Sequence, residues 1–379
     1  MSRDRGRIAF RDGMQSVFAG KFEGAEDMRH THEFKSVERI VYAAVAALII
    51  IVCAVCLQRQ QASQTSYTKE LFAMDTFFSL RAYGPGAEEA LAACEGRVEE
   101  LESLLSVTRE GSDIQRMNQG EHFAVSGDTF SVITSALELG GETEGTLDIT
   151  LYPVLREWGF TTGEYQIPQA ETLQALLEKV DYRTVSLDDS ALTVSVPEGV
   201  ELDLGAVAKG YTGDCLLTLL KERGVTSAML DLCGNIQVLG EKPDGSAWRV
   251  AVRNPFDMSN SLGVLEVRDK SVITSGNYER YFVGEDGNIY GHILNPSDGY
   301  PADSGLAAVT IVGDSGVRCD GLSTALFVMG KDAAVDYWQQ HRDFEMLLVT
   351  EDAHLYMTEG LTECFACSED WDAEIIRGE

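Results

Sequence analysis

The chain has 379 residues, enough for one large domain or two ordinary ones with a sizeable core. Its 44% hydrophobic and 24% charged residues are typical of a globular protein and exclude an intrinsically disordered one. The formal net charge of −31 excludes binding to nucleic acid through surface charge, because the phosphates would be repelled. If this protein binds an anionic nucleotide, it needs a metal ion or local hydrogen-bond donors.

An uncharged run near the N-terminus predicts a membrane anchor. Residues 40–57 read IVYAAVAALIIIVCAVCL, just long enough to cross a bilayer as a helix. A slight excess of basic residues before the run favours a cytoplasmic tail at 1–39 and an extracytoplasmic remainder. We predict an uncleaved, single-pass signal anchor in the cell membrane. A cleaved signal peptide and a lipoprotein modified at Cys53 or Cys56 are the alternatives.

Beyond a Gln- and Ser-rich linker at 58–67, hydrophobic periodicity predicts both strands and helices. In chain order, we expect a strand at 69–83, helices at 87–105, 128–144 and 171–180, paired strands at 184–187 and 192–196, a helix at 207–223, strands at 227–232, 236–239, 247–253, 262–267, 280–283 and 306–312, helices at 315–329 and 333–341, and strands at 345–349 and 353–357. Hairpins without regular strand–helix alternation indicate an α+β fold of mixed, largely antiparallel sheets with packed helices. We expect one catalytic domain at 68–360 and a C-terminal tail at 361–379.

The eight cysteines do not form the pattern of a disulfide scaffold, because those outside the apolar run are scattered. Cys364 and Cys367 form a lone C-x-x-C in the predicted tail. A redox motif or half of a metal site is conceivable there. We favour a local disulfide or two idle thiols, because no second pair accompanies the first.

The first segment that could support chemistry is LDLGAVAKGY at 202–211. A strand ends there, Gly205 allows a sharp turn, and a helix starts near Ala206. Free amides at the helix start, with Lys209 one turn further, make a candidate phosphate cradle. The segment lacks the spacing of a Walker A motif, and by itself an incidental surface lysine is an equally good interpretation.

The second segment is CDGLSTAL at 319–326. Asp320 and Thr324 are four residues apart, so their oxygens lie on the same face of a helix. A carboxylate and a hydroxyl in an otherwise apolar helix suit a hard cation such as Mg²⁺. By itself, the segment favours an Asp320 that only complements the dipole of its helix.

The third region combines TSGNY at 274–278 with HILNPSDGYP at 292–301. Asn-Pro and Asp-Gly steps indicate a tight loop, and His292 comes just before it. A lone histidine next to a turn is more often structural than catalytic.

Taken together and in this order, the motifs are specific. With DIT at 148–150 and DLCGNI at 231–236, they resemble the ApbE family of FAD:protein FMN transferases from about residue 74 to 360. The resemblance implies an ApbE-like, T-fold-like domain. It also implies an enzyme that moves FMN from FAD onto a hydroxyl of another protein.

The resemblance assigns roles to individual residues. FAD binding is implied for Met74, Thr108, Thr146, Leu147, Asp148, Asp203, Lys209, Ile293 and Ser323. A Mg²⁺ site is implied for the backbone carbonyl of Ala206 and the side chains of Asp320 and Thr324. The chain departs from the family's usual pattern at Asp75 and Cys233, where glycine is usual, and at Thr108, where an aromatic residue is common.

The implied reaction is attack by a Ser or Thr hydroxyl on the FMN-side phosphorus of FAD, with AMP leaving. Lys209 would assist at the phosphates. His292 is our candidate general base, with Asp203 as the alternative. The implied partner is an acceptor flavoprotein with a Ser/Thr-Gly-Ala-Thr-like segment, either a membrane redox subunit or an extracytoplasmic flavoprotein. An FAD pyrophosphatase and a non-catalytic FAD-binding protein are the alternative functions.

Overall fold

The computed structural model describes residue 39, residues 41–54 and residues 64–378, in a chain that divides into two compact units at 1–61 and 62–379. In the first unit, residues 41–54 are helical and their side chains are exposed. Among the described residues, no helix combines the length and the apolar character that a membrane crossing requires. Residues 40 and 55–57 of the predicted anchor lie outside the described part, as do residues 1–38 and 58–63 of the predicted tail and linker.

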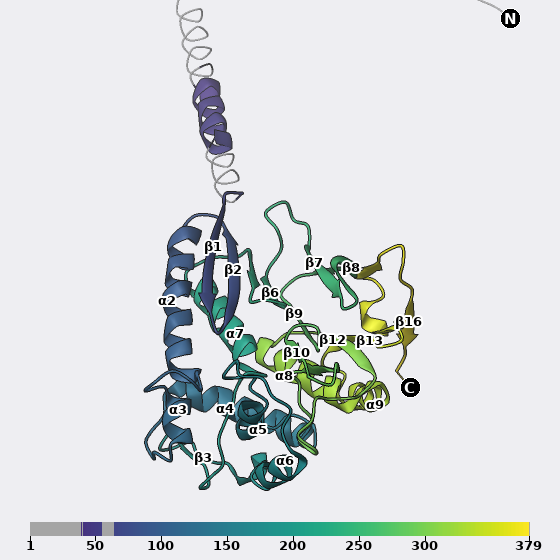
Figure 1. The fold of residues 1–379 in the computed structure, drawn as a ribbon. Helices are drawn as coiled ribbons and strands as arrows, with labels where there is room; N and C mark the ends of the chain where they lie inside the picture. Colours follow the sequence, from purple (N-terminus) through teal and green to yellow (C-terminus); the bar gives the residue numbers. More distant parts are fainter. Residues whose placement is uncertain (1–38, 40, 55–63, 379) are drawn as a thin grey trace, which may run out of the picture. The chain divides into compact units, whose positions relative to one another are not determined.

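The second unit is built on one large sheet, in line with the predicted α+β class (Figure 1). Within residues 64–378, its nine strands follow the order β1-β2-β5-β6-β9-β12-β13-β14-β16, antiparallel except for the parallel pair β14–β16. The strands are β1 (Ser66–Ala73), β2 (Thr76–Tyr83), β5 (Ala228–Asp231), β6 (Asn235–Leu239), β9 (Ser271–Gly276), β12 (Leu306–Gly313), β13 (Glu345–Thr350), β14 (Leu355–Thr358) and β16 (Ala373–Ile376).

Smaller sheets and helices complete this unit. The remaining strands are β3 (Ser186–Asp188) paired with β4 (Thr193–Ser195), β10 (Tyr281–Val283) paired with β11 (Ile289–Gly291), and β7 (Trp248–Asn254), β8 (Asp257–Val267) and β15 (Phe365–Cys367) in one sheet. The helices are α2 (Ala87–Leu105), α3 (Asp113–Asn118), α4 (Gly127–Glu142), α5 (Tyr152–Glu157), α6 (Ala170–Leu177), α7 (Ala208–Glu222), α8 (Gly316–Met329) and α9 (Lys331–His341), with short 3₁₀ turns at Tyr182–Thr184 and Glu359–Leu361.

The large sheet is buried on both faces in its C-terminal half. On β12, Val309 and Ile311 pack into the core that holds α8 and α9. Their neighbours Ala308 and Val312 belong to the core shared with β7, β8 and β15. Because successive side chains of a strand point to opposite faces, the apolar side chains of β12 pack into the hydrophobic cores on both faces of the sheet.

The predicted strand at 69–83 is in fact a two-stranded hairpin, which lies along α2 (Figure 1). Ala73 pairs with Thr76, so the loop contains only Met74 and Asp75. Both have positive φ, 48° and 64°, as a tight turn with two left-handed residues requires. The sequence lacks the Asn-Gly signal that usually marks such a turn. For this reason the periodicity of apolar residues predicts one continuous strand at 69–83.

The C-terminal residues also differ from the prediction, because residues 361–379 are not simply a tail. β15 pairs with β8, and β16 extends the large sheet beside β14. Both strands are too short to show clear alternation, and their partners are distant in the sequence. Cys364 and Cys367, at the start of this region, are both free thiols.

Helices α7 and α8 cross at two glycines. A Cβ on Gly210 would meet the Gly316 backbone and would lie 2.7 Å from the Cβ of Asp320. Asp214 of α7 accepts hydrogen bonds from the amides of Gly316 (2.7 Å) and Val317 (3.0 Å), and so caps the start of α8. The crossing therefore fixes how the first turn of α7 faces Asp320.

We expect Gly210→Ala to destabilise the protein by about 1–3 kcal/mol, because a rigid backbone cannot yield to the added methyl group. Gly96→Ala is the matched control in the exposed middle of α2, where a Cβ meets nothing within 4 Å. We expect that substitution to stabilise by about 0.5–1 kcal/mol, because alanine favours helix. Urea unfolding of the two purified variants measures both; equal stability changes would contradict the close crossing.

Candidate active site

Lys209, in the first turn of α7, lies at the centre of a group of ionisable side chains. Burial raises the pKa of Asp320 on α8 and of Glu279, and the positive charge of Lys209 opposes both rises. Burial lowers the pKa of His292, and Lys209 adds to that decrease. The structure therefore brings together three of the predicted site residues from segments far apart in the sequence. It adds Glu279, which sequence analysis missed although it directly follows the TSGNY motif.

Asp320 is buried and holds the start of α7. Its Oδ2 accepts a hydrogen bond of 2.7 Å from the Gly210 amide. Burial raises the pKa of Asp320 to about 6, while Lys209 and the Gly210 amide oppose the rise. Gly210 is the third residue of α7, so its amide has no acceptor inside the helix, and the Asp320 carboxylate supplies one. Ala206 lies just before α7.

Three hydroxyl groups lie next to Asp320. Ser323 Oγ donates to the Asp320 carbonyl at 2.8 Å, and Ser275 Oγ lies 2.7 Å from Ser323 Oγ. Ser275 Oγ also lies 3.4 Å from Thr324 Oγ1, the hydroxyl predicted to bind a metal. The end of β9 thus adds Ser275 to the predicted pair on α8.

Two buried amides on β6 support the same region. Gln237 Nε2 donates to the Gly210 carbonyl at 2.9 Å and to Asn235 Oδ1 at 3.3 Å. Asn235 acts on Asp320 and lowers its pKa. Within residues 64–378, however, the buried Asn235 Nδ2 has no partner at hydrogen-bond distance. An unsatisfied buried donor beside a carboxylate is typical of a site that receives a polar ligand.

His292 is held as a neutral base. Its backbone amide and ring Nδ1 both lie 3.1 Å from the carbonyl of Arg280. Because a carbonyl only accepts, Nδ1 carries the proton and Nε2 keeps a free lone pair. Burial lowers the pKa of His292 to about 4, and Lys209 and Arg280 add to the decrease.

Asp203 lies beside Arg280. Its Oδ1 accepts from the Gly205 amide at 2.8 Å, and burial raises its pKa while Arg280 opposes the rise. Arg280 also forms an ion pair of 3.6 Å with Asp75 at the turn of the β1–β2 hairpin. Sequence analysis missed Arg280, and noted Asp75 only as a departure from the family pattern.

Two predicted flavin-binding residues pack against α7 and α8. The Met74 sulfur lies 3.7 Å from Thr212 Oγ1, and the Met74 amide donates to Glu102 at 2.7 Å. Leu147 is buried, and its side chain lies close to Gly321 of α8. Met74 therefore contacts α7 and Leu147 contacts α8, while their roles in flavin binding stay predictions.

The other predicted flavin-binding residues have local partners. Asp148 accepts from the Thr150 amide (2.8 Å), the Thr150 hydroxyl (2.6 Å) and the Tyr182 amide (2.9 Å), and so organises its own loop. Thr146 donates to the Thr143 carbonyl at 3.0 Å, and Ile293 lies in the core. Thr108 is exposed and hydrogen-bonds to Ser106. Their roles in flavin binding stay predictions.

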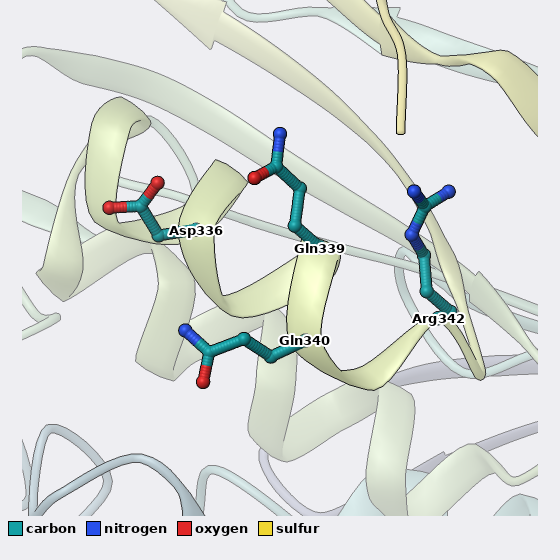
Figure 2. A pocket seen from close by; sticks show the side chains of 4 residues that line it. All are labelled: Asp336, Gln339, Gln340 and Arg342. Atoms are coloured by element: carbon teal, nitrogen blue, oxygen red, sulfur yellow. The ribbon is translucent and has the colours of Figure 1, made fainter. Parts of the chain in front are cut away.

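Two surface depressions lie away from this group. One is on α9 and the other adjoins the start of α9 and the β13–β14 turn. Figure 2 shows the side chains of the first, which leave the helix in different directions and do not converge: Asp336, Gln339, Gln340 and Arg342. Neither depression contains a predicted site residue, so the group around Lys209 is the candidate active site.

Comparison with known proteins identifies the family. Residues 74–348 match the model of the ApbE family. The chain is 32% identical over 261 residues to the FAD:protein FMN transferase of Vibrio cholerae serotype O1, covering 67% of this chain and 78% of that protein. It is 28% identical over 346 residues to the FAD:protein FMN transferase of Treponema pallidum, covering 85% and 95%.

Solved structures agree with this result. The crystal structure of the ApbE protein from Thermotoga maritima matches with a TM-score of 0.74 and 30% identity, over 79% of this chain and 99% of that one. The flavin transferase ApbE from Vibrio cholerae matches with a TM-score of 0.71 and 27% identity, over the same shares. The chain belongs to the ApbE family. The predicted family, α+β fold and enzyme class, a transferase, are confirmed.

We expect the His292 imidazole to titrate near pH 4 instead of near 6.5, because burial and two cations disfavour its charged form. Histidine proton resonances recorded by NMR across pH measure this, and the signal lost in His292→Gln makes the assignment. Between pH 4 and 6.5 the unfolded chain binds more protons at His292 than the folded chain does. The contribution of His292 to the free energy of unfolding is therefore lost as pH falls. Titration near pH 6.5 would contradict the half-buried, neutral imidazole.

Proposed function

We propose that the chain is an FAD:protein FMN transferase that requires Mg²⁺ and links FMN through a phosphoester bond to a Ser or Thr of an acceptor flavoprotein. The observation that supports this best is the group of Lys209, Asp320 and His292 at the start of α7, in a chain of the ApbE family. A cation, a buried carboxylate and a neutral imidazole are the groups that transfer of a phosphoryl compound needs.

The residues fit Mg²⁺, which prefers oxygen ligands and keeps some sites for water and substrate phosphate. Asp320 and Thr324 would hold it with their side chains, and Ala206 with its backbone carbonyl. Among the described residues, no group of three or more His, Cys, Asp or Glu could hold a metal, so substrate oxygens and water have to complete this shell. When bound, Mg²⁺ would neutralise a diphosphate that a chain of net charge −31 otherwise repels.

In the proposed reaction, the acceptor hydroxyl oxygen forms a bond to the FMN-side phosphorus of FAD. The bond between that phosphorus and the bridging oxygen breaks, and AMP leaves with this oxygen. The hydroxyl proton passes to Nε2 of His292, or alternatively to Asp203. Lys209 stabilises charge on the phosphate oxygens.

The proposed place of the enzyme is the outer face of the cell membrane, tethered by residues 40–57. The exposed apolar side chains of residues 41–54 support this, because an apolar helix in water needs a partner such as lipid. The acceptor would carry a Ser/Thr-Gly-Ala-Thr-like segment, on a membrane redox subunit or an extracytoplasmic flavoprotein.

We expect Asp320→Asn to reduce Mg²⁺-dependent AMP release at least 100-fold, about 2.7 kcal/mol of lost transition-state stabilisation. The amide oxygen still accepts from Gly210, so the fold is preserved while the charge is removed. Purified protein is mixed with FAD, Mg²⁺ and acceptor; fluorescent acceptor on a denaturing gel reports transfer. Free FMN and AMP without label would indicate a pyrophosphatase, and intact FAD a binding protein. Unchanged turnover by the variant would contradict the metal site.

We expect the full chain to stay with the membrane pellet after alkaline carbonate washing, and a chain lacking residues 1–57 to be released. Immunoblots of the two fractions measure the distribution. Added protease should degrade the catalytic unit of intact spheroplasts, because we place it outside. Release of the full chain by carbonate would argue against the anchor.

A further inference from the structure

Large apolar side chains are exposed at the turn end of the β1–β2 hairpin. Phe72 and Phe77 are 62% and 74% exposed and pair across the two strands, with ring centroids 5.1 Å apart. Exposed phenylalanines cost solubility and contribute nothing to the core. Their position, two residues on either side of the Met74-Asp75 turn, makes them part of the surface around the site.

A second exposed apolar face lies on the β10–β11 hairpin. On its inner face, Phe282 and Tyr290 stack on each other and pack against Trp158 with tilted rings, which fixes the hairpin. On its outer face, Val283 and Ile289 are directly paired and are 62% and 66% exposed. A small sheet that is anchored on one face and apolar on the other presents a firm binding surface.

The two hairpins meet at the Asp75–Arg280 ion pair. Phe77 is two residues beyond Asp75, roughly 7 Å along the strand. Half-exposed Tyr281 directly follows Arg280, and His292 directly follows the last residue of β11. The exposed side chains therefore lie on the two hairpins that meet at Arg280, the residue whose carbonyl holds the candidate base. We call this set the hairpin surface: Phe72, Phe77, Tyr281, Val283 and Ile289.

We propose that the hairpin surface binds the acceptor protein, through apolar side chains that flank the hydroxyl to be modified. This inference rests on the proposed function. A protein hydroxyl that gives its proton to His292 must approach beside β11, so its flanking residues have to cover the surface around this histidine. Interfaces are enriched in aromatic and aliphatic anchors at their centre, as here.

A lipid bilayer is the other surface that would cover exposed phenylalanines. The position of the pair favours the acceptor. Phe72 and Phe77 lie at the turn end of the hairpin, whereas the predicted linker joins it at Ser66. The strand places about 20 Å between Ser66 and Phe72. The Asp75–Arg280 ion pair in the middle of the surface also suits a protein partner better than hydrocarbon.

The test measures KM for a purified acceptor domain that carries a Ser/Thr-Gly-Ala-Thr-like segment, with the full chain in detergent. We expect Phe77→Ser and the double substitution Val283→Ser with Ile289→Ser each to raise this KM at least tenfold. The kcat at saturating acceptor and KM for FAD should stay within twofold, because the substituted side chains face the partner. Met258→Ser, at a 51% exposed position on β8, is the matched control and should change nothing.

Each other result would overturn the inference. Wild-type KM values in both hairpin variants would remove the docking role, and an equal rise in the Met258 control would show that the effect is not local. A defect that appears only after reconstitution into phosphatidylcholine and phosphatidylglycerol vesicles would assign the surface to the bilayer. Failure of the unaltered chain to label the acceptor would overturn the proposed function and this inference together; normal labelling with unchanged KM would overturn the inference alone.

Discussion

The hydrogen bond between the Gly210 amide and the Asp320 carboxylate is the interaction on which the rest of the site depends. It joins two helices at their closest approach, and that approach is possible because Gly210 has no side chain. It also gives a partner to an amide of the first turn of α7, which has no acceptor inside the helix. One bond thus couples the packing of the two helices to the position of the Asp320 carboxylate. Asp214 and Gln237 support it from either side, by capping α8 and by holding the Gly210 carbonyl.

The long helices could be predicted well from the sequence, whereas the six-residue helices α3 and α5 were not predicted. α2 has the predicted bounds, and α7 and α8 begin and end within one residue of theirs, because apolar periodicity and glycine stops are local signals. The order of the motifs also led to Lys209, Asp320 and His292 as one site. Each motif alone supported an incidental lysine, a dipole-complementing aspartate or a structural histidine. Only their combination was informative, and the structure brings the three side chains together.

The remaining features depend on contacts between segments that are distant in the sequence. Neither the pairing of Asp75 with Arg280 nor the Asn235 amide beside Asp320 leaves a periodic signal, since each requires two loops or strands to meet. The same holds for β15 and β16, three and four residues long. The charge state of His292 was also out of reach, because it follows from burial and from neighbours that only the folded chain supplies.

The position of β16 affects the tendency of this protein to self-associate. An outermost strand offers unpaired amides and carbonyls to any other extended chain, and β14 would be such a strand without its parallel neighbour. Residues 373–376 therefore pair with the backbone groups of β14, and β16 becomes the outermost strand of the sheet in its place. Proteolysis that removes β16 would leave the catalytic groups intact but would expose the unpaired amides and carbonyls of β14. Loss of this strand would therefore first be seen as self-association.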